Sequence, residues 1–229
     1  MTAARCLALT AALALAPTPA AAQIYIGGDR PERGSIEIGG GGSWAPGFDM
    51  GERQAELTRS GSSGERFDLF SSESRVSGFP GVHARLGFYL SRSISIEGGV
   101  RYAKPELTVR LSGDAESAAD ETASETASHY VFDGSLLYHF VRASFAGGRG
   151  IPFVSGGGGY IRELHEGNEL VETGTEYHAT VGIKYWLGSG RRRLGVRGEV
   201  GLSARDKGFD NEEGRRTGPL ALGGVSFLF

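Results

Sequence analysis

The chain has 229 residues, of which 38 are glycine, and its 24 basic and 27 acidic side chains give a net charge of −3. The glycines follow no Gly-X-Y period and the chain holds one cysteine, which excludes collagen-like and disulfide-rich proteins. A slightly negative chain whose longest basic run is Arg191–Arg193 offers no bulk attraction to nucleic acid, so we expect no nucleic-acid partner.

The N-terminal segment, residues 1–22, predicts a cleaved secretory signal peptide. Arg5 supplies a positive charge before an apolar run from Cys6 to Ala16, and Ala20–Ala22 provides the small residues of a cleavage site. The run is shorter than the roughly 18 to 20 residues that a membrane-spanning helix requires. We therefore expect export, removal of this segment and a mature domain of residues 23–229.

The mature chain alternates apolar and polar residues with a period of two, which is typical of β-strands with one apolar face. In the segment 93–103, Ile96 and Val100 share one face, while Glu97 and Arg101 share the other. No stretch sustains a period of 3.6, so no long helix is expected. The predicted strands are Gly34–Trp44, Gly81–Leu90, Ser93–Ala103, His129–Phe140, Pro152–Ile161, Thr175–Leu187, Arg192–Leu202 and Gly218–Phe229.

The fifth predicted strand is rich in glycine, and its pattern fits either phase. We choose Val154, Gly156, Gly158 and Tyr160 as its outward face. The sequence also leaves the boundaries of the segment 104–111 undetermined, because Leu107, Val109 and Leu111 fit an extension of the third strand.

The connections between these strands alternate between short and long. Short or moderate turns follow the second, fourth and sixth strands, whereas long segments follow the first, third, fifth and seventh. In an up-and-down barrel this order places every short turn at one end and every long segment at the other, as in outer-membrane barrels. The sequence therefore predicts an all-β fold, an eight-stranded antiparallel up-and-down transmembrane β-barrel.

The direction in which the apolar faces point separates a membrane barrel from a soluble one. Aromatic residues near strand ends, such as Trp44 and Tyr102, suit the girdles at membrane interfaces, and charges of both signs occupy the opposite faces at mid-strand. Charges in a filled interior must be paired. We expect an interior charge network of Glu37, Arg85, Glu97, Arg101, Asp133, Lys184, Arg197 and Glu199.

The last strand carries Val225, Phe227 and Phe229 at alternate positions. Together with the signal peptide and the eight strands, this pattern resembles the small outer-membrane β-barrels of the OmpA, OmpX, OmpW and opacity-protein kind. The resemblance implies that Val225, Phe227 and Phe229 form the signal read by the outer-membrane assembly machinery. It also implies a porin-like cell-envelope protein of a Gram-negative outer membrane, with lipid and lipopolysaccharide as partners.

Few chemical motifs remain. A phosphate-binding loop needs a helix after it, and none is expected after the glycine tetrads Gly39–Gly42 and Gly156–Gly159. We therefore expect these glycines to relieve crowding between the strands of a small barrel. The histidines show no spacing typical of metal ligands, and those on strands are expected inside the lumen. The five histidines are His83, His129, His139, His165 and His178.

Catalysis is not expected. Asp133 and His139 could form a protease-like pair, but both fall on inward faces, and no histidine begins the His-x-Ser motif of outer-membrane deacylases. We therefore expect no catalytic, cofactor-binding or metal-binding residues and no cofactor.

The long segments are the natural place for function, because scaffolds of this kind carry function on loops. Residues 45–78 have balanced charge and suggest partial order, whereas residues 112–128 are acidic and suggest a solvated, mobile tip. A third segment holds an acidic group that could bind cations bridging lipopolysaccharide phosphates, and basic residues that could contact the phosphates directly. These residues are Asp206, Asp210, Glu212 and Glu213, and Arg205, Lys207, Arg215 and Arg216.

The function expected from the sequence is a non-catalytic structural or surface-interaction role carried by long extracellular segments. One alternative is a narrow channel for small or hydrophobic solutes, which the OmpW resemblance allows. Another is a secreted, lipocalin-like binding barrel.

Overall fold

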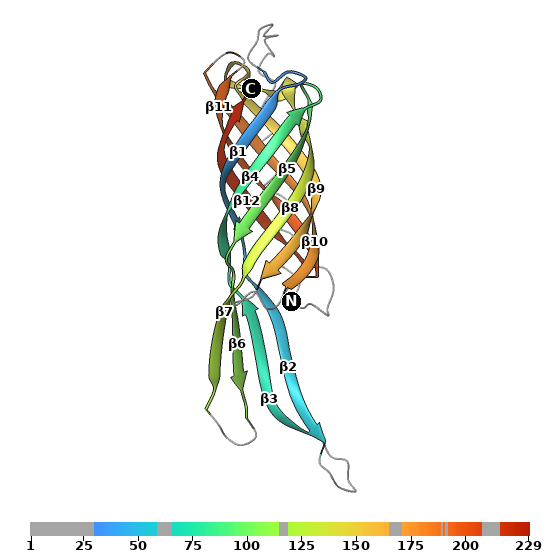
Figure 1. The fold of residues 1–229 in the computed structure, drawn as a ribbon, viewed down its shortest axis with the longest axis vertical. Coiled ribbons are helices and arrows are strands. Elements are labelled where there is room, and N and C mark those ends of the chain that lie inside the picture. The colour runs from blue at the N-terminus through green and yellow to red at the C-terminus, as the bar shows by residue number, and fades with distance from the viewer. Residues whose placement is uncertain are drawn as a thin grey trace, which may run out of the picture.

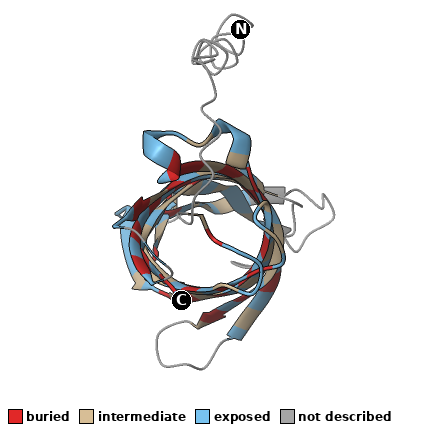
Figure 2. Cartoon of the chain, turned by 90° about the horizontal axis from the view of Figure 1, so that it is seen from above, coloured by how far each residue is buried: buried red, intermediate tan, exposed pale blue. Residues whose placement is uncertain are grey.

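The computed structural model describes residues 30–58, 66–114, 119–164, 171–188, 190, 192–207 and 216–229. The predicted signal peptide, residues 1–22, lies outside them. Eight antiparallel strands close into a barrel in the order β1-β12-β11-β10-β9-β8-β5-β4, which confirms the predicted fold (Figures 1 and 2). The barrel strands are β1 (Ile36–Ala45), β4 (Phe79–Tyr89), β5 (Ile94–Ala103), β8 (Ser128–His139), β9 (Gly150–Leu164), β10 (Val171–Leu187), β11 (Arg193–Lys207) and β12 (Arg216–Leu228).

The described helices are η1 (Val141–Ala143) and η2 (Ala146–Gly148), both in the connection between β8 and β9. Within the described ranges, no helix is long and apolar enough to cross a membrane.

Glycine allows the barrel to close. β1 pairs with β12 from Glu37 opposite Leu228 to Trp44 opposite Ala221. A Cβ added at Gly41 would overlap the carbonyl oxygen of Gly223, so the two strands approach this closely only because position 41 has no side chain. The first glycine tetrad therefore lies within a tightly paired strand.

Apolar side chains point outward from the barrel wall. Leu136 is 57% exposed and Val200 58% exposed, whereas the neighbouring charged positions on the same strands point inward. This arrangement suits lipid outside and polar contacts inside. A lipocalin-like barrel needs the opposite arrangement, so that alternative is wrong. In β9, Gly156 and Tyr160 are exposed and Phe153 is buried, which confirms the chosen phase.

Aromatic side chains form two bands on the outer wall. The rings of Tyr102 and Tyr130 lie 4.8 Å apart near the end of the barrel at which β1 ends with Ala45, the residue after Trp44. Near the other end, the rings of Phe227 and Phe229 meet edge to face at 4.7 Å. Such bands mark the two interfaces of a membrane.

The two longest connections are not loops. They fold into the hairpins β2 (Phe48–Thr58) with β3 (Arg66–Val76), and β6 (Glu106–Ser112) with β7 (Glu121–Thr126). β3 pairs with β6, so the hairpins join in a four-stranded sheet of order β2-β3-β6-β7. Figure 1 shows them extending beyond the lower end of the barrel, which we call the hairpin end. The opposite end, with the connections 90–93, 140–149 and 188–192, is the turn end.

This sheet corrects two expectations about the connections. Leu107, Val109 and Leu111 do not extend the third barrel strand, because they belong to β6 and face β7 across a separate ladder. Residues 121–126 form β7 and are not a mobile tip. β6 does alternate, through Leu107, Val109 and Leu111, but β2, β3 and β7 carry no sustained apolar alternation that would have identified the hairpins.

Candidate functional site

The barrel interior holds two clusters of ionised side chains. The turn-end cluster centres on Lys184, whose Nζ lies 2.7 Å from an oxygen of Glu37 and 2.8 Å from one of Glu97. Arg197 continues the chain with contacts of 2.7 Å to Glu97 and 2.9 Å to Glu199. Three cations face three carboxylates, so the cluster is electrically balanced. Its members are Glu37, Arg85, Glu97, Lys184, Arg197 and Glu199.

Neutral hydrogen-bonding groups complete this cluster. The Tyr89 hydroxyl donates to Glu37 at 2.8 Å, and the Thr180 hydroxyl donates to Glu199 at 2.9 Å. Arg85 lies 2.7 Å from Glu199 on the opposite side of the lumen. Buried ions are tolerated only when each is paired and hydrogen-bonded, and these contacts meet that requirement.

Glycines make room for the long charged side chains. A Cβ added at Gly87 would lie 3.2 Å from the Glu97 side chain, and one at Gly182 would lie 2.7 Å from the Cβ of Glu199. Inward glycines alternating with Arg, Lys and Glu therefore let eight narrow strands enclose a salt-bridge network.

The hairpin-end cluster lies farther along the axis. Arg101 pairs with Glu176 and with Asp133, the latter at 3.3 Å, and the Nε of Arg205 donates to Glu176 at 3.0 Å. Two cations face two carboxylates, so this cluster is balanced as well. Glu176 accepts bonds from two arginines on two different strands, β5 and β11, and so links opposite parts of the wall.

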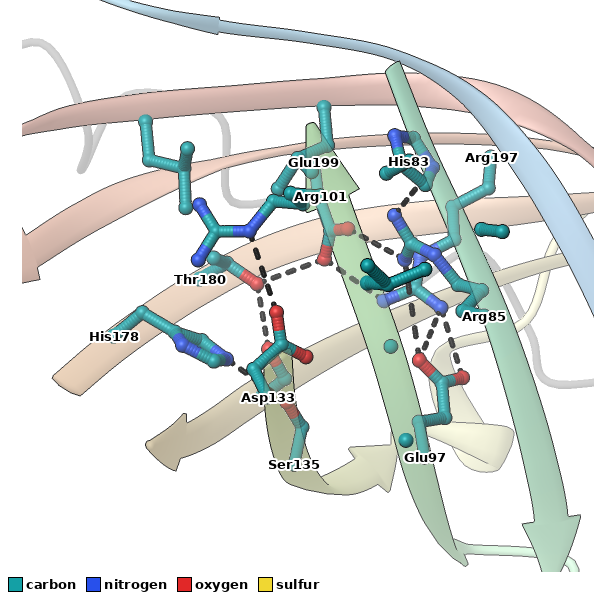
Figure 3. A pocket seen from close by; sticks show the side chains of 17 residues that line it. His83, Arg85, Glu97, Arg101, Asp133, Ser135, His178, Thr180, Arg197 and Glu199 are labelled. Carbon is teal, nitrogen blue, oxygen red and sulfur yellow. Dashed lines mark hydrogen bonds and ion pairs between the residues drawn. The ribbon is translucent and has the colours of Figure 1, made fainter. Parts of the chain in front are cut away.

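Figure 3 shows the space between the two clusters, with His83, Thr180 and Ser135 beside the charged groups. The hollow has a volume of about 40 Å³, enough for a few water molecules but not for an organic solute. The interior is therefore nearly filled at this level.

Apolar layers close the lumen on both sides of the charges. Toward the turn end, Trp186 and Tyr89 are fully buried against Ile151 and Leu228. Toward the hairpin end, Phe79 and Val76 pack with three alanines. A solute crossing the barrel along its axis would have to displace both layers and the ion pairs between them.

The lumenal histidines are hydrogen-bonded to interior partners. His139 contacts the Ser95 hydroxyl at 2.9 Å, and His178 contacts that of Ser135 at 2.8 Å. Asp133 pairs with Arg101, so it does not form the protease-like pair with His139 considered from the sequence. His83 and His129 contact Arg85 and Glu163, each at 2.7 Å.

In the described part of the chain, no group of three His, Cys, Asp or Glu residues is placed to hold a metal ion. His165 lies outside the described residues.

The structure places all eight charges expected from the sequence in these two clusters. Two members were missed. Glu176 sits on an inward position that the strand phase identified without assigning it to the network, and Arg205 was placed in a loop. Arg205 lies where β11 continues past the predicted end at Leu202, so strand length was the missing signal for this residue, whereas Glu176 lies within the predicted strand Thr175–Leu187.

The residues expected to form the assembly signal lie on the outer wall at the turn end. Val225 is 55% exposed and Phe229 49% exposed, and Phe227 lies between them on the same face. Their recognition by assembly machinery stays a prediction.

No protein-family model and no curated protein sequence matches the chain. Among solved structures, it is similar to the outer membrane protein OprG from Pseudomonas aeruginosa, with 11% identity over 86% of this chain and 97% of that one, and a TM-score of 0.51. The N-terminal β-barrel domain of OprF from the same organism is 12% identical over 87% of this chain and all of that one, with a TM-score of 0.34. The likeness to OprG shows that this chain has the fold of a small outer-membrane barrel.

Proposed function

We propose that the protein is an outer-membrane β-barrel with a non-catalytic structural or surface-interaction role, carried by the hairpin sheet outside the membrane. The observation that carries this proposal is the barrel interior, which is filled with balanced ion pairs and closed by apolar layers. Such an interior favours an anchor over a conduit. The likeness to OprG supports the location.

The hairpin sheet is the surface available to a partner. It extends past the barrel beyond the aromatic band that contains Tyr102, so it lies outside the membrane when the band sits at the interface (Figure 1). Its exposed ion pairs, such as Arg75 with Asp49 at 2.6 Å, suit a solvated surface.

Three measurements test this proposal. Density fractionation of cell membranes should recover the protein with the outer membrane, and its gel mobility should shift between unheated and boiled samples. Planar bilayers should show no reproducible conductance steps. Recovery in the periplasm without detergent would contradict the membrane location.

A narrow channel is the second candidate, favoured by the ionised groups along the axis and the hollow of about 40 Å³ between them. Reproducible steps in the planar bilayer that change in size when Glu97 is replaced by Gln would establish it. The same result would displace the structural role.

A further inference from the structure

A pocket opens at the hairpin end where the barrel wall separates. β1 and β12 pair as far as Trp44 opposite Ala221, and β1 then turns away into β2 through Pro46 and Gly47. β12 continues along β11 as far as Arg216 opposite Arg205. The resulting mouth pocket has a volume of about 220 Å³, suited to a small ligand. Its walls include Pro46, Phe48, Arg205, Lys207, Arg216 and Pro219.

The charges of the mouth pocket differ from those of the interior clusters. Three cations line it, Arg205, Lys207 and Arg216, against one carboxylate, that of Glu163. An oxygen of Glu163 already lies 2.7 Å from the Nδ1 of His129. Arg205 is already paired with Glu176 in the hairpin-end cluster, so Lys207 and Arg216 supply the excess positive charge of the pocket lining over Glu163.

The arginines are held in position by hydrogen bonds that, among the described residues, use one N–H group of each side chain. Arg216 donates from Nη1 to the carbonyl oxygen of Asp49 at 2.8 Å, and its guanidinium lies 4.8 Å from the centre of the Phe48 ring. Arg205 donates to Glu176 through its Nε, which carries one of the five N–H groups of the guanidinium. Guanidinium groups fixed in this way are suited to carboxylate and phosphate oxygens.

The rest of the lining is apolar. Phe48, Pro46 and Pro219 face the same space as the cations, so the pocket combines a charged part with an apolar part. Lys207, the last residue of β11, adopts a left-handed backbone conformation with φ of 66°, which is costly for a residue with a Cβ.

The pocket also lies at a defined membrane level. Pro46 is two residues beyond Trp44, which points outward and is 48% exposed in the hairpin-end aromatic region. Aromatic bands sit at the level of lipid headgroups. Anionic groups attached to apolar chains are concentrated at that level.

We propose that the mouth pocket binds the anionic head of an amphiphile, a phosphate or carboxylate joined to an apolar chain. The cations hold the head, and Phe48 with the two prolines contacts the start of the chain. This binding function goes beyond the structural role proposed above and is independent of it.

The test uses the full-length mature protein folded in a neutral detergent, with binding measured by calorimetry. Sodium octanoate provides both an anionic head group and an apolar chain. 1-Octanol provides the apolar chain without the anionic charge, and inorganic phosphate provides an anion without a chain. Octanoate should bind at least about tenfold more tightly than either. Equal binding of octanol or of inorganic phosphate would overturn the proposal.

Variants locate the binding. The double substitution Lys207→Gln with Arg216→Gln should weaken octanoate binding at least about tenfold. The control Arg92→Gln with Arg142→Gln removes the same charge at the turn end and should leave it unchanged. Gly218→Leu fills the pocket without removing a charge and should also abolish binding. Unchanged binding in the pocket variants, with the heat-dependent gel shift intact, would overturn the proposal.

A final arm separates two sources of the anion. Short-chain phosphatidic acid that displaces octanoate and binds more tightly than it supports a lipid phosphate as the natural ligand. Tighter binding of octanoate supports a free carboxylate. Failure of both to bind overturns the proposal while leaving the outer-membrane location, tested by fractionation, unaffected.

Discussion

Replacing Lys184 by Met should destabilise the barrel strongly. Lys184 is 1% exposed and bridges Glu37 and Glu97. Glu97 keeps Arg197 at 2.7 Å, but among the described residues Glu37 keeps only the hydrogen bond from the Tyr89 hydroxyl, and its Oε1 has no hydrogen-bond partner there. The substitution therefore leaves one carboxylate buried without a cation.

Removing one partner of a buried ion pair costs about 3–5 kcal/mol. We expect the lower end of this range, about 3 kcal/mol, because only one of the two carboxylates loses its sole cation. Adding Glu37→Gln removes the stranded charge and restores a balanced cluster of two cations and two carboxylates. The double variant should therefore return to within about 1–2 kcal/mol of the native protein.

The assay is equilibrium urea unfolding of protein folded into phospholipid vesicles, followed by tryptophan fluorescence and gel mobility. Arg92→Met is the matched control, because Arg92 pairs with Glu32 at 3.4 Å on an exposed surface and such pairs contribute about 0–1 kcal/mol. The reasoning is refuted if Lys184→Met costs less than about 1 kcal/mol, or if the double variant is no more stable than the single one.

Three further predictions test the wall and the hairpins. Gly41→Ala should prevent folding or slow it severely, because a Cβ would overlap the Gly223 carbonyl, whereas Gly198→Ala, with open space around it, should fold normally in a vesicle-folding assay. Leu136→Arg places a charge on the lipid-facing wall and should cost about 2–4 kcal/mol in urea unfolding; a neutral result would contradict lipid contact. Replacing residues 104–127 by a short turn should preserve the heat-dependent gel shift, because β5 and β8 pair directly from Ala103 opposite His129; loss of the shift would show that the barrel depends on its hairpin.

The barrel strands could be predicted from the sequence because one physical requirement acts on all of them. A wall with lipid on one side and ion pairs on the other forces strict alternation, as at Ile96 and Glu97, and both residues lie where this pattern places them. Strand ends were harder to locate. Beyond the bilayer the alternation weakens, so the continuation of β11 to Lys207 was not apparent and Arg205 was assigned to a loop.

The hairpins could not be predicted for a related reason. β2 and β3 carry charges on both faces, and their ladder shifts register twice, between Asp49 and Gly51 and between Ala55 and Glu56. The pairing of β2 with β3 is then determined by backbone hydrogen bonds, and the alternation of apolar and polar side chains contributes little to it. The mouth pocket depends on this geometry, because the turn from β1 into β2 brings Phe48 next to Arg216, 168 positions away in the chain.

The most direct measurement compares lipid contact at an outward and an inward tryptophan. The chain has two tryptophans, Trp44 on the outer wall and Trp186 buried in the turn-end layer. In vesicles of lipids brominated in the acyl chains, a Trp44→Phe variant, which keeps only Trp186, should retain its fluorescence. Adding Leu136→Trp should introduce emission that the brominated chains quench strongly. Quenching of Trp186, or none at position 136, would contradict a barrel with its apolar face in lipid and its charges inside.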